Sequence, residues 1–133
     1  MKYIAFGYYN ENTWDAMPES EQQRFMDECL AYDDELRTRG PVGGDALQTV
    51  KKAKTVRLRN GQVTVTDGPF AETKEQIGGF FSFEARDIDE AVRIVSKHPG
   101  LKAGPFEIRG VDDMTELVRE SEHRRSTKNQ KGK

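Results

Sequence analysis

The chain has 133 residues, of which 35% are apolar and 33% charged, and its formal charge is −2. This length fits one domain with a single core, and the near-neutral charge gives no electrostatic reason to expect nucleic acid or an anionic membrane as a partner. No apolar run approaches the roughly 20 residues that span a bilayer, the N-terminus lacks a signal-peptide cleavage site, and one cysteine allows no internal disulfide. We therefore expect a cytoplasmic protein.

The first expected element is a strand over residues 2–9, KYIAFGYY, which is rich in β-forming residues. Apolar side chains alternate onto both of its faces, so we expect both faces to be covered. The following segment, NENTWDAM, is expected to be a polar loop. Tyr8 and Trp14 are the aromatic residues that we expect to line a cleft at the end of this strand; for Tyr8 the alternative is the core or a dimer interface.

A long helix is expected next, from Pro18 to the stop at Gly40-Pro41. Its buried stripe consists of apolar residues at helical spacing: Phe25, Cys29, Tyr32 and Leu36. Because Cys29 lies in this stripe, we interpret it as a small buried hydrophobe and not as a nucleophile. The segment PVGGDALQTVKKAK, which begins at Pro41, is expected to be a loop.

A β-hairpin is expected over residues 55–66, TVRLRNGQVTVT, because Asn60-Gly61 is the preferred pair for a two-residue type I′ turn. This turn fixes a register in which four apolar residues share one face, with Leu58 opposite Val63 and Val56 opposite Val65. Arg57 and Arg59 lie on the other face. They form either an anion-binding pair or, as we favour, an exposed charged surface that resists edge aggregation.

The last part of the domain is expected to contain two strands and a helix between them. GGFFSFEA, residues 78–85, is the first strand, and Asp87 begins the helix, with Glu90 three residues on as a variant of the capping box. The helix stops at His98-Pro99-Gly100, and residues 106–111 form the last core strand. Residues 112–125 are expected to form a short amphipathic helix, and residues 126–133 a disordered basic tail in solvent.

This order of elements predicts an α+β fold, a ferredoxin-like sandwich with both helices on one face of the sheet. The hairpin is either an embellishment or a source of sheet strands. Because two helices cover one face while the strands carry apolar residues on both, a second copy is the simplest cover for the other face. We expect a homodimer with facing sheets, in which residues 1–111 form the domain and residues 112–133 the C-terminal helix and tail.

The segment after the hairpin holds the main candidate for chemistry, Asp67. It stands in the same alternating row as Val63 and Val65, so a regular strand points its carboxylate to the apolar side. A carboxylate in that setting has to be hydrogen-bonded or paired. Two interpretations stay open: an Asx-turn that organises the loop, and a pocket-facing carboxylate that anchors a ligand or acts as an acid–base group.

Glu72, Lys74 and Gly79 are the remaining candidates for binding a ligand beside Asp67. For Glu72 and Lys74 the alternative is a solvated charged face, and for Gly79 it is a bend at the start of a strand. The two histidines stand in unrelated contexts, so they do not predict a zinc site. We expect no metal and no cofactor.

The segment TVRLRNGQVTVTDGPFAETKEQIGGFFSFEARDIDEAVRIV resembles the DGPF-type branch of the YCII-related family. The DGPF motif at residues 67–70 is intact and is followed by AETKE and GGF, and the similarity extends from about residue 2 to residue 111. The resemblance implies a dimeric α+β barrel built from ferredoxin-like units. Genes of this branch lie beside those of extracytoplasmic-function sigma factors, which implies a regulatory or stress-response context.

The resemblance implies no defined reaction. Related YCII-like proteins are suspected of catalysis through a paired histidine and aspartate in a cleft, and here Asp67 can fill the aspartate role. No histidine stands near Asp67 in the sequence, since His98 is at a helix end and His123 is near the tail. Two functions are therefore predicted as alternatives: binding of a small molecule in a cleft near Asp67, with or without acid–base catalysis, and a non-catalytic dimeric interaction or regulatory module.

Overall fold

The structure, a computed structural model, describes residues 1–131. The helices and strands follow in the order β1 (Lys2–Tyr9), α1 (Glu11–Asp15), α2 (Glu19–Arg37), β2 (Gly43–Ala46), β3 (Lys54–Arg59), β4 (Gln62–Asp67), β5 (Gln76–Glu84), α3 (Ile88–Ser96), β6 (Phe106–Gly110) and α4 (Thr115–Lys131). Two short 3₁₀ helices, η1 (Val50–Lys52) and η2 (Pro99–Lys102), precede β3 and β6. Within residues 1–131, no helix is long and apolar enough to cross a membrane.

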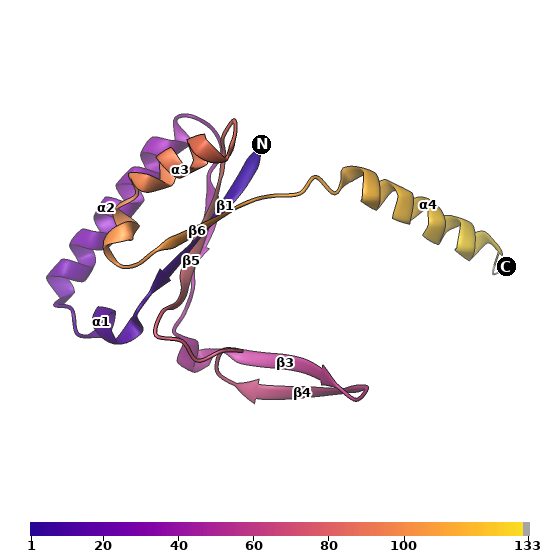
Figure 1. The fold of residues 1–133 in the computed structure, drawn as a ribbon, viewed down its shortest axis with the longest axis horizontal. Helices are drawn as coiled ribbons and strands as arrows, with labels where there is room; N and C mark the ends of the chain where they lie inside the picture. The colour runs from indigo at the N-terminus through magenta and orange to yellow at the C-terminus, as the bar shows by residue number, and fades with distance from the viewer. Residues whose placement is uncertain (132–133) are drawn as a thin grey trace.

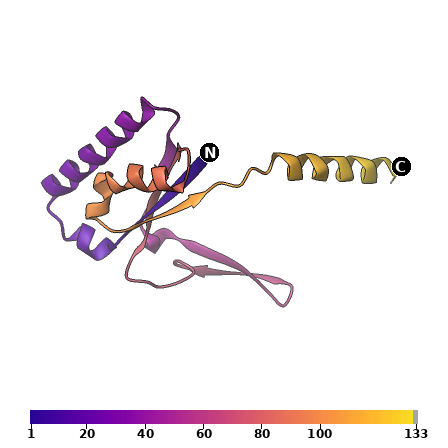
Figure 2. The ribbon, with the colours of Figure 1, turned by 45° about the horizontal axis from the view of Figure 1, so that its top comes forward.

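Four strands form an antiparallel sheet in the order β2-β5-β1-β6. Helices α2 and α3 lie together on one face of this sheet (Figure 1; Figure 2). Each of the two helices joins strands that have another strand between them, which is the ferredoxin-like arrangement that the sequence predicted. Strands β3 and β4 pair only with each other, so the hairpin is an embellishment and contributes no strand to the sheet.

The core lies between the sheet and the two helices. On β1, Tyr3 and Ala5 face the helices, opposite Phe83 and Phe81 of β5, and all four side chains are buried. Leu36 of α2 and two α3 residues close the core from the other side: Ala91 and Val95. Burial of each large apolar side chain contributes about 1.5–3 kcal/mol to the free energy of unfolding, so this layer defines which sheet face the helices occupy.

The local signals in the sequence produce the expected turns and caps. In the hairpin, Asn60 and Gly61 have φ angles of 50° and 77°, and the predicted register is confirmed. At the start of α3, the Asp87 carboxylate accepts a hydrogen bond from the Glu90 N–H at 2.8 Å. The Glu90 carboxylate in turn accepts one from the Arg86 N–H at 3.2 Å. The predicted capping box is therefore present. Its second hydrogen bond goes from the Arg86 N–H to Glu90, one residue before the N-cap residue Asp87, which would be the usual donor.

Two segments that the sequence predicted to be loops contain regular structure. The NENTWDAM segment forms α1 because the Asn10 side chain accepts hydrogen bonds from the N–H groups of Asn12 and Thr13, at 2.9 and 3.2 Å. The Gly-Gly segment forms β2, which pairs with β5 from Gly43↔Ser82 to Ala46↔Gly79. Neither segment carries apolar residues at a regular helix or strand spacing, so the structure there comes from a local cap in one case and from edge pairing in the other.

The C-terminal segment differs from the prediction in length. Helix α4 continues to Lys131, so residues 126–131, predicted to be disordered, are helical, and residues 132 and 133 lie outside the described part. The Asp113 carboxylate accepts a hydrogen bond from the Thr115 N–H at 3.0 Å, and Glu116 pairs with Arg119 one turn on. Capping and pairs of this kind support a helix without a packed face. Helix α4 projects from the body of the protein (Figure 1).

Replacement of the α3 cap should weaken the fold measurably. We expect Asp87→Ala to lower the free energy of unfolding by about 1 kcal/mol, because the Glu90 N–H loses its acceptor. Urea denaturation followed by circular dichroism measures this change. Asp89→Ala, an exposed acid in the same turn, is the control and should have a smaller effect. Equal losses in the two variants would show that the charge, and not the capping bond, stabilises α3.

Candidate functional site

A cavity of ≈ 420 Å³ lies between α2 and the helix-covered face of the sheet, next to the edge strand β2. Its volume falls in the range of small-molecule sites, roughly 300–1,000 Å³. Most of its lining is apolar or aromatic, including Phe25, Met26, Leu30, Val42, Phe81 and Phe106. The charged lining comes from α2 and β2: Asp33, Arg37 and Asp45.

Three of the residues predicted from the sequence to bind a ligand line this cavity: Tyr8, Trp14 and Gly79. Trp14 of α1 lies edge-on to Phe25, with ring centroids 5.5 Å apart, and edge-on to Tyr9 at 6.5 Å. At Gly79 a Cβ atom would lie 3.0 Å from the Asp45 carbonyl oxygen. The glycine therefore allows β2 to approach β5 closely where the two strands form the cavity wall.

The other three predicted site residues, Asp67, Glu72 and Lys74, do not line the cavity. Glu72 and Lys74 are exposed in the segment between β4 and β5. Asp67 ends β4, and its side chain is 83% exposed and pairs with Lys54 of β3. Within one subunit, residues 1–131 place no second layer over the apolar face of the hairpin, so the structure does not give Asp67 the sheltered setting that was expected, although its register position lies on that face.

The DGPF corner instead closes the root of the hairpin. Gly68 has a φ of 91°, which favours glycine. Its N–H donates to the Ala53 carbonyl at 2.8 Å, and its own carbonyl accepts from the Thr55 hydroxyl at 2.8 Å. The Asp67 carboxylate pairs with Lys54 and not with the backbone N–H groups that an Asx-turn would use. The corner is thus a structural turn held by backbone groups.

A buried histidine–aspartate pair that the sequence analysis missed forms the polar part of the cavity wall. His98 Nε2 lies 3.2 Å from Asp33 Oδ1, and their side chains are 7% and 21% exposed. His98 Nδ1 accepts a hydrogen bond from the Gly100 N–H at 2.9 Å, which caps η2. Because Nδ1 is an acceptor, the hydrogen-bond network assigns the proton of the neutral ring to Nε2, which donates to Asp33.

The aromatic core holds the His98 ring in place. Phe81 stacks on it with centroids 5.0 Å apart and an interplanar angle of 27°. Tyr32 and Phe106 contact it edge-on, each at 5.2 Å. A histidine enclosed by three rings keeps one orientation, so it holds Asp33 in one orientation as well.

A sequence signal for this pair did exist. Asp33 follows Cys29 by four residues and precedes Arg37 by four, so it lies beside the buried stripe of α2 and not on its outer face. His98 stands between α3 and η2, where the sequence analysis interpreted it only as part of a helix stop. Asp33 and His98 are 65 positions apart in the sequence, so no local pattern pairs them.

Two other titratable groups that line the cavity, Cys29 and Tyr9, are neutral at physiological pH. Burial raises the pKa of the Cys29 thiol to about 11, and the negative charges of Asp33 and Glu28 add to this effect. Burial likewise raises the pKa of Tyr9, with contributions from Glu11 and Asp15. Cys29 is therefore a thiol and not a nucleophilic thiolate, which leaves Asp33 as the lining carboxylate with a fixed partner.

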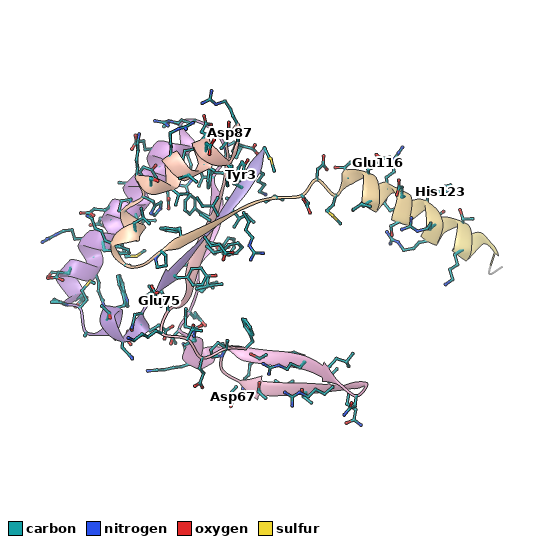
Figure 3. The ribbon with its side chains drawn as sticks, viewed as in Figure 1. Tyr3, Asp67, Glu75, Asp87, Glu116 and His123 are labelled. Carbon is teal, nitrogen blue, oxygen red and sulfur yellow. The ribbon has the colours of Figure 1, made fainter. Side chains whose placement is uncertain are left out.

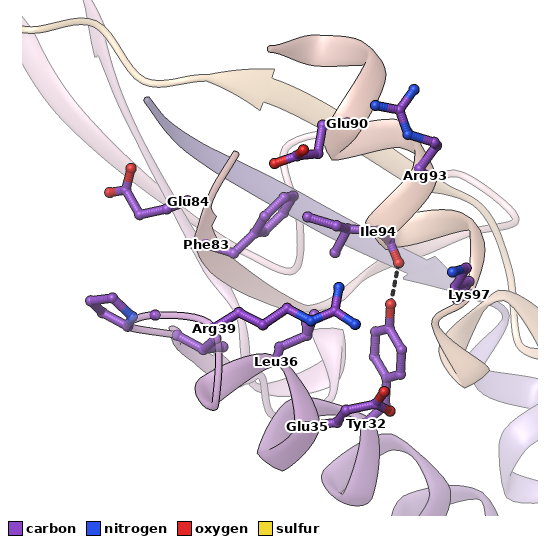
Figure 4. Close-up of a pocket in the computed structure, with 13 residues that line it drawn as sticks. Tyr32, Glu35, Leu36, Arg39, Phe83, Glu84, Glu90, Arg93, Ile94 and Lys97 are labelled. Carbon is purple, nitrogen blue, oxygen red and sulfur yellow. Dashed lines mark hydrogen bonds between the residues drawn. The ribbon is translucent and has the colours of Figure 1, made fainter. Parts of the chain in front are cut away.

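A second cavity, ≈ 400 Å³, lies between the end of α2 and α3 (Figure 4). Tyr32 crosses its floor and donates a hydrogen bond to the Ile94 carbonyl at 2.5 Å. Charged side chains of both signs surround it: Glu35, Arg39, Glu84, Glu90, Arg93 and Lys97. Lysine and arginine side chains near helix C-termini interact favourably with the helix dipole, so Arg39 and Lys97 have a structural role there. The buried pair makes the first cavity the candidate site.

Comparison with known proteins agrees with this architecture. A family model for the YCII-related domain matches residues 1–115. The chain belongs to the YCII-related family. The resemblance to the family that the DGPF segment indicated is thereby confirmed, and the match ends where α4 begins.

One sequence relative and one solved structure are similar to this YCII-related protein. An uncharacterized protein of Rhizobium meliloti (strain 1021) is 32% identical over 112 residues, which cover 82% of this chain and 90% of the relative. Among solved structures, the 5-chloro-2-hydroxyhydroquinone dehydrochlorinase TftG from Burkholderia phenoliruptrix AC1100, in complex with 2,5-dihydroxybenzoquinone, aligns with a TM-score of 0.41 and 20% identity. That alignment covers 84% of this chain and 94% of TftG.

The raised pKa of Cys29 gives a direct test of the cavity environment. At pH 8 a thiol of pKa about 11 has a thiolate fraction of about 0.1%, more than roughly a hundredfold below that of an exposed cysteine. We therefore expect slow reaction with a disulfide reagent at pH 8, and a rate that rises with pH up to about 11. The same protein in urea is the control and should react at the rate of a free cysteine. Fast labelling of the native protein at pH 8 would contradict the described burial.

Proposed function

We propose that this protein binds a small, largely apolar molecule in the cavity between α2 and the sheet, and that Asp33 acts there as hydrogen-bond acceptor and general base. The observation that supports this proposal is the His98–Asp33 pair in the wall of a mainly apolar cavity. Buried charged groups in such a setting are costly unless they are hydrogen-bonded, and a carboxylate held beside a cleft is a candidate for acid–base chemistry.

The apolar lining of the cavity favours a ligand whose surface is mostly apolar. Trp14 and Phe25 from helices α1 and α2 line the same cavity as Phe81 and Phe106 from the sheet. Aromatic rings in the lining favour a flat or compact apolar molecule, because its burial removes apolar surface from water. The ligand class is therefore a small molecule with one polar group and not a polyanion.

The polar pair selects and activates the reacting group. His98 uses both ring nitrogens, one with Gly100 and one with Asp33 Oδ1, so its role is to position and stabilise the carboxylate. Among residues 1–131 no hydrogen bond to Asp33 Oδ2 occurs, and this oxygen can accept a proton from a ligand O–H, N–H or acidic C–H group. Arg37, one turn further along α2, also lines the cavity and can stabilise negative charge that develops on the ligand.

A thermal-shift screen with a metabolite library tests this function. A ligand at a hundredfold excess over its Kd stabilises the native protein by about 2.7 kcal/mol. We expect Asp33→Asn, which keeps an acceptor for His98, to weaken binding of the hits at least tenfold because the charge is lost. Asp27→Asn, an exposed acid on the same helix, is the matched control. Asp67→Asn tests the earlier hypothesis in the same assay and should leave binding unchanged.

The outcomes separate the two candidate carboxylates. Equal stabilisation of wild type and Asp33→Asn by every hit would remove Asp33 from the site. Loss of binding in Asp67→Asn alone would show that the ligand binds at the DGPF corner and not in the cavity. A cavity-filling variant, Leu30→Trp, provides a second check, since it should abolish binding of any ligand that occupies this cavity.

The face of the sheet opposite the helices supports the second proposal, a homodimer. Ile4 and Phe6 of β1 and Phe80 of β5 lie on this face and are only half-buried, and the helices leave it open (Figure 2). We propose that a second copy covers it, as the facing-sheet arrangement predicts. A non-catalytic interaction or regulatory module is the alternative function that this surface favours. The link to sigma factors and the cytoplasmic location stay predictions.

Sedimentation equilibrium tests the dimer. We expect Phe6→Lys to raise the dimer dissociation constant at least tenfold, because the variant places a charge on the open face. Glu107, the cross-strand neighbour of residue 6, can pair with the new lysine, so the variant should keep the monomer fold. Ile88→Lys, at an apolar position of α3 that is 47% exposed, is the control. Unchanged dimerisation of Phe6→Lys, or a wild type that stays monomeric at high concentration, would overturn this proposal.

A further inference from the structure

One face of the hairpin carries four exposed apolar side chains, which we call the apolar stripe: Val56, Leu58, Val63 and Val65. Their exposed fractions are 64%, 73%, 68% and 61%. Cross-strand pairing aligns them into one continuous surface. The opposite face of the same two strands carries only polar side chains: Thr55, Arg57, Arg59, Gln62, Thr64 and Thr66. Apolar and polar side chains are therefore fully separated onto the two faces, from the Lys54↔Asp67 pair at the root of the hairpin to the turn at its tip.

An uncovered stripe of this kind is unusual for a stable protein. A two-stranded hairpin is marginally stable by itself in water, and sheets bury their apolar face against a second layer. An exposed apolar strand pair also favours uncontrolled aggregation. A sequence that needed only a soluble hairpin could carry threonine on both faces, so the stripe indicates a surface that is covered in the working form of the protein.

Within residues 1–131 the chain itself does not supply the cover. The root of the hairpin is fixed by the Glu11 carboxylate, which accepts hydrogen bonds from the Thr49 hydroxyl at 2.8 Å and the Val50 N–H at 2.9 Å. From this root the hairpin projects as an arm (Figure 1; Figure 2). Figure 3 shows Asp67 on this arm, away from Tyr3 in the core.

We propose that the apolar stripe is an interaction surface that a second copy of this chain covers. This inference rests on and deepens the homodimer proposed above. The arm projects on the side of the sheet opposite the helices (Figure 1), so a copy that covers the open face lies beside the arm. Two-fold symmetry then makes the contact reciprocal, and each copy covers the other's stripe.

The size of the surfaces favours a second copy. A stable interface buries about 800 Å² on each partner, whereas the largest apolar patch on a typical monomer is about 300–600 Å². Four side chains on a two-stranded arm are too few to reach the interface value. The stripe and the open sheet face together come closer to it, because the arm projects on the side of the sheet that the helices leave open (Figure 1).

The charges disfavour a membrane or nucleic acid as the occupant. The apolar stripe ends in Lys54 and Asp67, which pair with each other, so the stripe has no net charge of its own. Arg57 and Arg59 lie on the opposite face. A segment that inserts into an anionic bilayer carries unpaired basic side chains at the border of its apolar face, and this border has none among the described residues.

Cysteine labelling as a function of protein concentration tests the proposal. In a Cys29→Ser background, Val65→Cys places a thiol in the apolar stripe, and Thr66→Cys places one at the exposed neighbouring position on the other face. Labelling rates with a maleimide are measured below and above the dimer dissociation constant found by sedimentation. We expect the Val65→Cys rate to fall at least tenfold in the dimer and the Thr66→Cys rate to change less than twofold.

A second pair of variants removes dependence on the label. Leu58→Glu should raise the dimer dissociation constant at least tenfold, while Arg59→Glu on the opposite face should leave it unchanged. If Phe6→Lys disrupts the dimer but Leu58→Glu and the Val65→Cys labelling rate show no effect, the sheet dimer stands and the covered stripe is wrong. Protection of dilute Val65→Cys by phosphatidylglycerol vesicles, without protection by added protein, would also overturn it.

Discussion

The stacking of Phe81 on His98 connects the core of this protein to its candidate site. Phe81 stacks on Phe83 at 5.3 Å within the core and on His98 at 5.0 Å at the cavity. Because this packing places an imidazole among aromatic rings, both of its nitrogens have to find partners. Gly100 and Asp33 provide them. The orientation of the Asp33 carboxylate is thus a consequence of core packing around His98.

The two faces of the sheet carry different proposed roles. The face under the helices holds the cavity and its polar pair, and the open face and the hairpin arm offer surfaces for another copy. A ligand and a partner would therefore occupy separate places and would not compete. In a small domain with one sheet, this separation allows binding and assembly to be altered by different substitutions.

The parts of the fold that the sequence predicted depend on short-range rules. Alternation along β1, the Asn60-Gly61 turn and the Asp87 cap each involve residues within a few positions of one another, and the structure confirms them. Strand β2 was missed because its residues are poor β-formers, and it exists only because β5 offers an edge. The polar pair was missed because Asp33 and His98 meet only when α2 and η2 pack together.

Asp67 shows how far a local inference reaches. The alternation rule put its carboxylate on the predicted face of β4, but the rule does not say what lies beyond that face. A strand in the central sheet meets a second layer of its own subunit, whereas the described residues place none over a strand of the projecting arm. The family motif at residues 67–70 forms a turn at the root of the arm, and chemistry at its carboxylate stays a prediction.

The Glu11 carboxylate joins two parts of the molecule that have separate proposed tasks. It grips the root of the arm through Thr49 and Val50, and it sits on the same short helix as Trp14, whose indole borders the cavity. The short helix α1 therefore contacts the root of the arm through one of its side chains and borders the cavity through another. The place where a partner is proposed to bind and the place where a ligand is proposed to bind share one five-residue helix.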